Sequence, residues 1–402
     1  MTRVVVVGGG IVGCASAYFL AREGIEVELL EQEQVAYGAS GRNPGFVWLH
    51  CRNAGFALDI SLAGRKLYDT LAEDLPLPFE LRDSGGLMFF TSPDQAEVFS
   101  QFVEARRADG LEMELVDGAE VRRLAPPIRP DVLGGSFCPQ DAHINTPLLV
   151  RSLAEGARQQ GATIREGVTA TGLRRDGDRV TGVETTEGLV ESDHVVVASG
   201  VWATELLQRA GITVGVGGER LQVISTFPIA ERIQPCVYGP LAAKQYSLFR
   251  DLPAWDPAAF TEPYESEDAI ELLELVAQRE DGSVLLGCPM DYPAEIDQRP
   301  TLAGIAATAI RISEDFPGLA NAPIDKTWAG MLPYTADTAP IIDEIEPGLF
   351  AAIGHVYGNA AGPMTGRLIA QLVLDQQPEL DLEEARFDRD LALPTAGEPV
   401  RW

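Results

Sequence analysis

The chain has 402 residues, of which 46% are hydrophobic and 23% charged, a composition typical of a globular protein long enough for two domains. Its 60 acidic side chains outnumber its 31 lysines and arginines, and the resulting net charge of −29 disfavours nucleic acid and anionic membrane surfaces as partners. No apolar run reaches the roughly 20 residues that cross a bilayer, so we expect a soluble protein.

The start of the chain predicts a strand, a helix and a second strand. Residues 4–7 are a β-branched run typical of a buried parallel strand. Residues 15–22 carry small and apolar side chains at helical spacing, and Gly24 follows as the residue that ends the helix. Residues 26–30 predict the next strand, with Glu31 at its end. This order indicates a βαβ unit.

The first turn of this unit has the pattern G-x-G-x-x-G. Gly8 permits the tight turn, Gly10 lets the backbone approach a pyrophosphate, and Gly13 lets the helix pack closely on the strand. Glu31 stands where a ribose needs a hydrogen-bond acceptor, and its charge disfavours NADP. Glycines that serve only as turns are the alternative, and the pattern does not decide between FAD and NAD.

A loop of small residues with one cation follows at 37–45. Ser40 can bond a phosphate, and Arg42 and Asn43 can reach the edge of a ring. The alternative is a mobile surface loop.

Further elements follow in the middle of the chain. Thr146 and Pro147 predict the N-cap and first residue of a helix that Gly161 closes. Residues 176–178, Asp-Gly-Asp, predict a hairpin turn. Residues 195–202, V-V-V-A-S-G-V-W, begin as a strand.

The last part of the chain carries W-A-G-M-L-P-Y-T-A-D at 328–337 and P-I-I at 340–342. Residues 349–353 predict a final strand. It opens into a loop at 354–363, and a helix is expected from Met364.

Together these segments resemble the D-amino acid oxidase superfamily, in the branch of sarcosine oxidase, glycine oxidase and D-hydroxyproline dehydrogenase. The resemblance implies FAD rather than NAD. It implies that the backbone of Val168 meets the adenine and that the loop at 354–363 faces the pyrimidine end of the flavin, where a helix dipole would stabilise the anionic reduced form. A covalent flavin in the family needs a cysteine near the C-terminus. Cys288 is the last cysteine, so we expect noncovalent FAD. The expected cofactor-binding residues are Gly8, Gly10, Ile11, Val12, Gly13, Glu31, Gln32, Ser40, Gly41, Arg42, Asn43, Gly45, Val168, Ala198, Gly200, Trp202, Gly354, His355, Gly358, Asn359 and Ala360.

The expected fold class is α/β, with a discontinuous Rossmann-type FAD-binding domain and an α+β substrate-binding domain built on a mixed sheet. We expect the FAD-binding domain at 1–80, 142–215 and 320–402, and the substrate-binding domain at 81–141 and 216–319. The connection at 224–270 is longer than is usual in the family. It indicates a lid or an interface, unless it is merely decorative.

The resemblance implies oxidation of an amine or amino acid, by hydride transfer to flavin N5 and hydrolysis of the resulting imine. The substrate-pocket candidates are His50, Arg52, Tyr334, His355 and Tyr357. Arg52 lies where sarcosine oxidases keep a substrate-binding arginine and can hold a carboxylate bidentately, with a surface salt bridge as the alternative. For His355 the alternative is a histidine that caps backbone groups, and for the tyrosines simple burial.

Two positions depart from the glycine oxidase pattern. Leu332 stands where those enzymes have an arginine that binds the substrate carboxylate. They carry another arginine in the last loop, where this chain has Tyr357 and Gly358. Either Arg52 or another arginine takes over, or the substrate is larger, or it lacks a carboxylate.

The electron acceptor is expected to be O₂ or a partner subunit. The five cysteines contain no C-x-x-C pair, which argues against a disulfide framework, a metal site and an iron–sulfur cluster and favours a reducing cytoplasm. Two other functions stay open. One is a flavin monooxygenase, which shares the first βαβ unit, and the other is a flavin-binding structural or electron-transfer subunit of a dehydrogenase complex.

Overall fold

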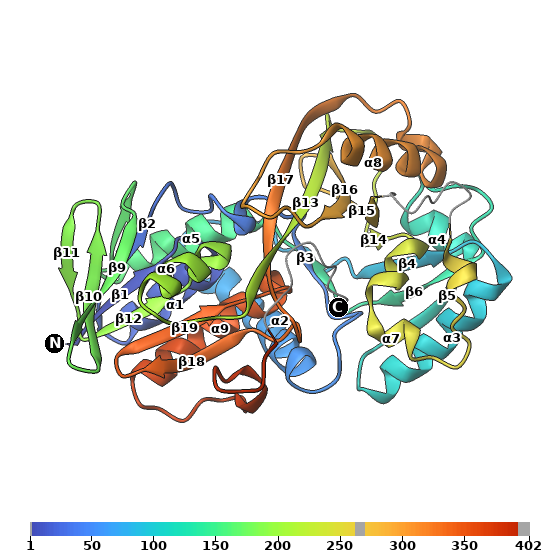
Figure 1. Ribbon diagram of the computed structural model, residues 1–402. Coiled ribbons are helices and arrows are strands. Elements are labelled where there is room, and N and C mark those ends of the chain that lie inside the picture. Colours follow the sequence, from blue (N-terminus) through green and yellow to red (C-terminus); the bar gives the residue numbers. More distant parts are fainter. Residues whose placement is uncertain (1, 262–269, 393–402) are drawn as a thin grey trace.

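The computed structural model describes residues 2–261 and 270–392, which are arranged around two large β-sheets (Figure 1). One sheet has six strands and the other eight, and two small sheets complete the set among the described residues. The predicted α/β class is confirmed. None of the helices in the described part of the chain combines the length and the apolar character that crossing a membrane requires.

The six-stranded sheet has the order β18-β19-β12-β1-β2-β8, and its strands are parallel except for β18 at one edge. The strands are β1 (Arg3–Val7), β2 (Glu26–Glu31), β8 (Thr163–Glu166), β12 (His194–Val197), β18 (Ile341–Glu346) and β19 (Leu349–Ile353). The predicted first unit is therefore present, with β1 at the centre of the sheet. Segments from both ends of the chain and from its middle meet in this one sheet.

The two faces of this sheet are covered by different elements, as the alternation along β1 requires. Val4 and Val6 pack into the core that holds α1 (Ile11–Arg22), while Val5 and Val7 pack against the three-stranded sheet. The helices α2 (Phe56–Asp74), α5 (Thr146–Gln159) and α9 (Gly358–Val373) join α1. The three-stranded sheet contains β9 (Ala170–Asp176), β10 (Arg179–Thr185) and β11 (Gly188–Glu191), and α6 (Ala203–Arg209) lies beside it.

The eight-stranded sheet has the order β17-β13-β16-β15-β14-β4-β6-β5 and mixes parallel and antiparallel pairs. Its strands are β4 (Gly86–Phe90), β5 (Glu114–Asp117), β6 (Gly134–Cys138), β13 (Val216–Thr226), β14 (Cys236–Tyr238), β15 (Glu271–Gln278), β16 (Val284–Asp291) and β17 (Ile324–Thr335). Leu87 and Phe89 of β4 face α4 (Gly118–Leu124) and α8 (Leu302–Asp315), whereas Met88 and Phe90 face α3 (Pro93–Ala108). A short pair, β3 (Phe46–Val47) and β7 (Ala142–His143), connects the two halves.

Strand β17 belongs to the eight-stranded sheet, because it pairs with β13 along almost its whole length. By this criterion the boundary that we placed at residue 320 lies after Thr335. Figure 1 shows β13 and β17 running together from one half of the molecule to the other.

The long connection at 224–270 packs against the protein, although residues 262–269 lie outside the described part. It contains β14, a short helix α7 (Ser247–Arg250) and the fully buried rings of Tyr246, Phe249 and Phe260. Phe249 stacks on Phe102 of α3 with the ring centroids 3.9 Å apart. In its described part the connection is therefore a piece of the core rather than a decorative excursion.

Two helix starts differ from the sequence prediction. Helix α5 is capped by Asn145, whose side chain accepts the N–H of Leu148, and Thr146 is the first helical residue. Helix α9 starts at Gly358, six residues before Met364, and contains Pro363. The missing N–H of Pro363 would leave the Asn359 carbonyl without its helical donor. The hydroxyl of Tyr68 donates to that carbonyl at 2.5 Å instead, so the helix tolerates the proline.

Candidate active site

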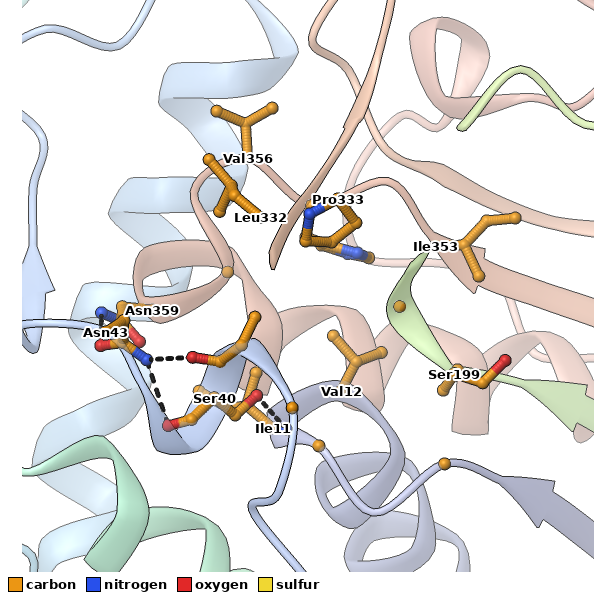
Figure 2. A pocket seen from close by; sticks show the side chains of 18 of the residues that line it. Ile11, Val12, Ser40, Asn43, Ser199, Leu332, Pro333, Ile353, Val356 and Asn359 are labelled. Carbon is orange, nitrogen blue, oxygen red and sulfur yellow. Dashed lines mark hydrogen bonds between the residues drawn. The ribbon is translucent and has the colours of Figure 1, made fainter. Parts of the chain in front are cut away.

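One continuous cavity runs from the β1–α1 turn to the start of α9 and on to the face of the eight-stranded sheet. Its empty volume is about 1600 Å³. This volume includes space that is open to solvent. The wall extends from the β1–α1 turn to the eight-stranded sheet, so a cofactor and a substrate could lie side by side along it. Figure 2 shows Ile11, Val12 and Ser199 on one side of it and Leu332, Pro333 and Val356 on another.

The β1–α1 turn has the geometry of an anion site. Gly8 has a φ of +114°, and a Cβ on Gly13 would lie 1.9 Å from the Gly8 carbonyl oxygen, so both positions require glycine. At Gly10 a Cβ would meet only the Ser40 hydroxyl, at 3.2 Å, and the rest of its surroundings is open cavity. No acidic residue occupies the first turn of α1, so the free N–H groups there can receive a phosphate.

Glu31 lies in the cavity wall at the end of β2. Its carboxylate accepts the N–H of Gly9 at 2.6 Å and the N–H of Glu33 at 2.9 Å. Burial raises the pKa of this carboxyl, and the two backbone hydrogen bonds act in the opposite direction. The carboxylate therefore fixes the turn and still has lone pairs to accept hydroxyl groups of a ribose. The N–H of Val168 donates to the Glu31 carbonyl at 2.9 Å, so of its two backbone groups only the carbonyl could meet an adenine.

The loop at 37–45 is fixed to its surroundings and is not a mobile surface loop. The Asn43 amide nitrogen donates to the carbonyls of Ala39 and Ser40, both at 3.1 Å (Figure 2). Its amide oxygen accepts the Asn359 side chain of α9 and the Thr146 hydroxyl of α5, each at 2.9 Å. The Ser40 hydroxyl accepts the N–H of Ile11 at 3.0 Å and keeps its own proton for donation.

The cavity wall contains most of the residues expected to bind the cofactor. These are Gly8, Gly10, Ile11, Val12, Glu31, Gln32, Ser40, Asn43, Val168, Ala198, Gly200, Trp202, Gly354, His355, Gly358, Asn359 and Ala360. Four others lie behind the wall.

The residues behind the wall have packing roles. Gly13 packs on Gly8, as described above. A Cβ on Gly41 would lie 1.7 Å from the Ala36 carbonyl oxygen, and one on Gly45 would lie 2.0 Å from that of Ile144. Arg42 donates to the carbonyls of Tyr37 and Ala329 and holds the loop against β17. The expectation that Arg42 reaches the edge of a ring is therefore not supported by its position.

Arg52 lies in the cavity wall and is 8% exposed, so it is not a surface residue. Its Nε donates to the Trp48 carbonyl at 2.9 Å, and its guanidinium lies 4.8 Å from the centroid of the Tyr357 ring. It forms no ion pair with an acidic side chain of the described residues, so its terminal nitrogens are available to a ligand carboxylate.

His50 is not part of the cavity, which corrects its place among the substrate-pocket candidates. It is fully buried between the rings of Trp48 and Phe102, and its two ring nitrogens contact Asp141 at 3.2 Å and Ser136 at 2.7 Å. Burial lowers the pKa of this imidazole although the Asp141 carboxylate opposes the shift. Regular strand alternation would place Trp48, His50 and Arg52 on the same side. A turn at residues 50–51 interrupts the strand geometry, so Trp48 and Arg52 line the cavity while His50 lies in the support behind it.

Tyr334 also lies outside the cavity wall. It is 2% exposed, its ring covers Gly217 of β13, and it meets Tyr292 edge-on. Gly217 has no side chain, and the Tyr334 ring fills the space that this leaves. Tyr334 is therefore a buried core residue, which was the alternative to a place in the pocket.

His355 and Tyr357 both line the cavity at the start of α9. The His355 Nε2 contacts the Thr365 hydroxyl at 2.9 Å, and burial lowers the pKa of the imidazole to about 3, so it is neutral at physiological pH. The hydroxyl of Tyr357 is buried without a hydrogen-bond partner among the described residues, as is the hydroxyl of Ser199 near the dinucleotide turn. A buried hydroxyl without a partner lowers the stability of the fold by about 1–3 kcal/mol. The cost indicates that a polar ligand belongs beside Tyr357 and beside Ser199.

The sequence did not reveal how Arg52 is supported. Arg106 of α3 is fully buried and donates to the carbonyls of His50 at 3.1 Å and Arg52 at 2.7 Å. Asp141 accepts the N–H groups of Leu49 and His50. No local motif marks these contacts, because the partners are between 54 and 92 residues apart.

His143 lies between Arg82 and the loop at 37–45, and its burial predicts a pH dependence of stability. It accepts from Arg82 and contacts the Pro44 carbonyl at 3.0 Å, and burial together with the Arg82 charge lowers its pKa to about 3. The unfolded state binds the proton near pH 6.5 and the folded state only near pH 3. Stability should therefore rise with pH across that interval, by up to about 1.4 kcal/mol per pH unit.

The variant His143→Gln keeps one donor and one acceptor but does not titrate. Its free energy of unfolding, measured by urea denaturation from pH 7 to 4, should depend less steeply on pH than that of the unmodified protein. Parallel curves would show that His143 does not carry this dependence.

Comparisons with known proteins agree with this geometry. The family model described as DAO, FAD dependent oxidoreductase, matches residues 3–372. Glycine oxidase of Bacillus subtilis (strain 168) is 27% identical over 97% of this chain and 98% of its own length. Sarcosine oxidase subunit beta of Rhizobium meliloti (strain 1021) is 26% identical over 96% of this chain and 88% of its own. The crystal structure of glycine oxidase from Geobacillus kaustophilus has the same fold, with a TM-score of 0.83 at 22% identity over 98% of this chain and all of that one.

The cofactor of the family fits the cavity. The glycine turn and the open first turn of α1 suit a diphosphate, and Glu31 suits a ribose. Ser199 and Tyr357, whose hydroxyls have no partner among the described residues, line the same cavity. The described residues contain no cluster of side chains that could hold a metal ion. The chain belongs to the DAO family of FAD-dependent oxidoreductases.

Proposed function

We propose that the protein oxidises an amino acid or related amine at the end of the cavity where Arg52 lies. The observation that carries this proposal is a single buried guanidinium without an acidic partner in the described structure, in the wall of the cavity that also contains the dinucleotide turn. The names of two relatives support it, because one is called a glycine oxidase and the other a subunit of sarcosine oxidase.

The reaction requires few groups from the protein. Bound FAD supplies the two-electron acceptor. The substrate loses a hydride from the carbon that carries the amine and a proton from the nitrogen, and water hydrolyses the C=N bond to a carbonyl compound and an amine or ammonia. Arg52 would orient the carboxylate, while neutral His355 and the neutral hydroxyl of Tyr357 would place no further charge in the cavity wall. Burial raises the pKa of Tyr357, so the hydroxyl keeps its proton.

Anaerobic mixing of the purified holoenzyme with a panel of amines and amino acids tests the function directly. Loss of the oxidised flavin absorbance with at least one of them is the expected result. A flavin that no amine bleaches would overturn the proposal and favour a structural or electron-transfer subunit. Bleaching only by NAD(P)H would favour a monooxygenase. Readmission of air would then distinguish O₂ from a partner subunit as the acceptor.

We further propose that FAD is bound noncovalently. Cys288 is far from the C-terminus in sequence, but it lines the cavity, so its position in the chain alone does not exclude a bond to the flavin. However, all five cysteines are buried, and burial raises the pKa of the Cys288 thiol, which suppresses the reactive thiolate. Precipitation with acid should release all of the yellow colour into the supernatant. Colour that stays with the pellet would indicate a covalent bond.

We also propose that the protein is cytoplasmic and that a partner subunit can accept its electrons. Free cysteines that form no disulfide among the described residues suit a reducing compartment. One relative is itself named as a subunit, which supports a search for a partner that copurifies with this chain.

A further inference from the structure

The cavity also indicates which amino acids the enzyme takes, an inference that rests on the proposed function. We propose that the substrate is a neutral amino acid with one carboxylate and a large apolar side chain, rather than glycine, sarcosine or a dicarboxylic amino acid. Three features of the wall around Arg52 carry this proposal.

The first feature is the charge of the wall. Among the described residues that line the cavity, the only aspartate, glutamate, lysine or arginine side chains are Glu31 and Arg52. Glu31 belongs to the dinucleotide turn and is held by two backbone N–H groups. Within the described wall, Arg52 is thus the one cation available to the substrate, and it can neutralise one carboxylate. A second carboxylate would be buried without a partner, which is strongly unfavourable.

The second feature is the apolar surface beyond Arg52. Strands β13 to β16 of the eight-stranded sheet present one face to the cavity, and neighbouring segments complete the wall. The side chains that matter are Phe46, Leu221, Tyr238, Leu273, Leu275 and Leu332. Glycine or sarcosine would leave this surface uncovered, whereas a phenyl or long aliphatic group would cover it. Burial of such a group is expected to improve affinity between about tenfold and a hundredfold.

The third feature is the way in which Arg52 is held. Its Nε is bonded to the Trp48 carbonyl, its guanidinium packs on the Tyr357 ring, and Arg106 holds its backbone carbonyl. The side chain cannot swing to follow a carboxylate that sits elsewhere. The unpartnered Tyr357 hydroxyl lies in the same wall and can donate to that carboxylate. The carboxylate therefore has a fixed place, and the side chain must project along the apolar face.

The test compares substrates of matched charge on the unmodified holoenzyme. The panel contains glycine, sarcosine, both enantiomers of aspartate and both enantiomers of phenylalanine and leucine, with flavin reduction as the signal. A kcat/KM at least tenfold higher for one enantiomer of phenylalanine or leucine than for glycine, sarcosine and aspartate is the expected result. If glycine, sarcosine or aspartate is the better substrate, amine oxidation stands and the substrate class proposed here is wrong. If no amine reduces the flavin, both proposals fall.

Binding without turnover gives an independent readout. Acetate, succinate and 3-phenylpropanoate correspond to glycine, aspartate and phenylalanine without the amine, and each can be titrated against the visible spectrum of the bound flavin. Phenylpropanoate should bind at least tenfold more tightly than acetate or succinate. Equal dissociation constants would overturn the role of the apolar face.

A pair of matched variants locates the specificity. Leu275 and Leu286 lie on adjacent strands, β15 and β16, with Leu275 in the cavity wall and Leu286 in the core on the opposite face of the sheet. Leu275→Phe should lower the preference for phenylpropanoate over acetate at least fivefold, since the added ring fills the space. Leu286→Phe adds the same bulk behind the sheet and should leave this ratio unchanged. Equal ratios in the two variants would contradict the proposal.

Discussion

Gly10→Leu is expected to yield a folded protein that contains no flavin. At this position the Cβ itself is tolerable, because it would meet only the Ser40 hydroxyl at 3.2 Å. The rest of a leucine side chain would extend into the cavity over the first turn of α1, where the diphosphate is expected to meet the free N–H groups. Flavin absorbance relative to protein absorbance, measured after purification with added FAD, checks the result.

A graded series separates this steric effect from misfolding. Gly10→Ala should retain a large part of the flavin, while Gly13→Ala should disturb the fold itself, because its Cβ would lie 1.9 Å from the Gly8 carbonyl oxygen. Far-ultraviolet circular dichroism of Gly10→Leu should match that of the unmodified protein. A yellow Gly10→Leu protein with full flavin content would refute the placement of the diphosphate at this turn.

The βαβ unit could be predicted from the sequence because all of its determinants are local. The apolar run of β1, the three glycines and the acid at the end of β2 lie within 31 residues, and each constrains the backbone by itself. The start of α9 could not be predicted in this way. A proline normally ends or precedes a helix, and the Tyr68 hydroxyl that compensates for Pro363 comes from a distant part of the chain.

The candidate site was less predictable than the fold for the same reason. His50 and Arg52 are two residues apart and were both expected in the pocket, yet only Arg52 lines it. The difference depends on Asp141, Ser136 and Phe102, which surround His50 from the β6–β7 loop, β6 and α3. Sequence can indicate that such a segment lies beside the cofactor, but packing against distant residues decides which side chain faces the cavity.

Arg52→Met is expected to lower kcat/KM for the best carboxylate substrate by more than about thirtyfold. Methionine keeps most of the length and the apolar stem, so the packing on Tyr357 is retained while the charge is lost. Removal of one partner from a buried charge pair costs about 2 to 5 kcal/mol, and at 1.4 kcal/mol per factor of ten this corresponds to roughly 30-fold or more. Steady-state kinetics and the titration with 3-phenylpropanoate should both show the loss.

The control substrate for this variant is an amine without a carboxylate, such as 2-phenylethylamine. Arg52→Met should affect the oxidation of this amine little, because the amine offers no partner to the guanidinium. Arg65→Met removes an arginine of α2 that pairs with Asp69 and Asp83 outside the cavity wall, and it should leave both substrates unaffected. If Arg52→Met slowed the two substrates equally, the arginine would be supporting the cavity wall rather than recognising a carboxylate. The assignment of amino acids as substrates would then lose its main structural support.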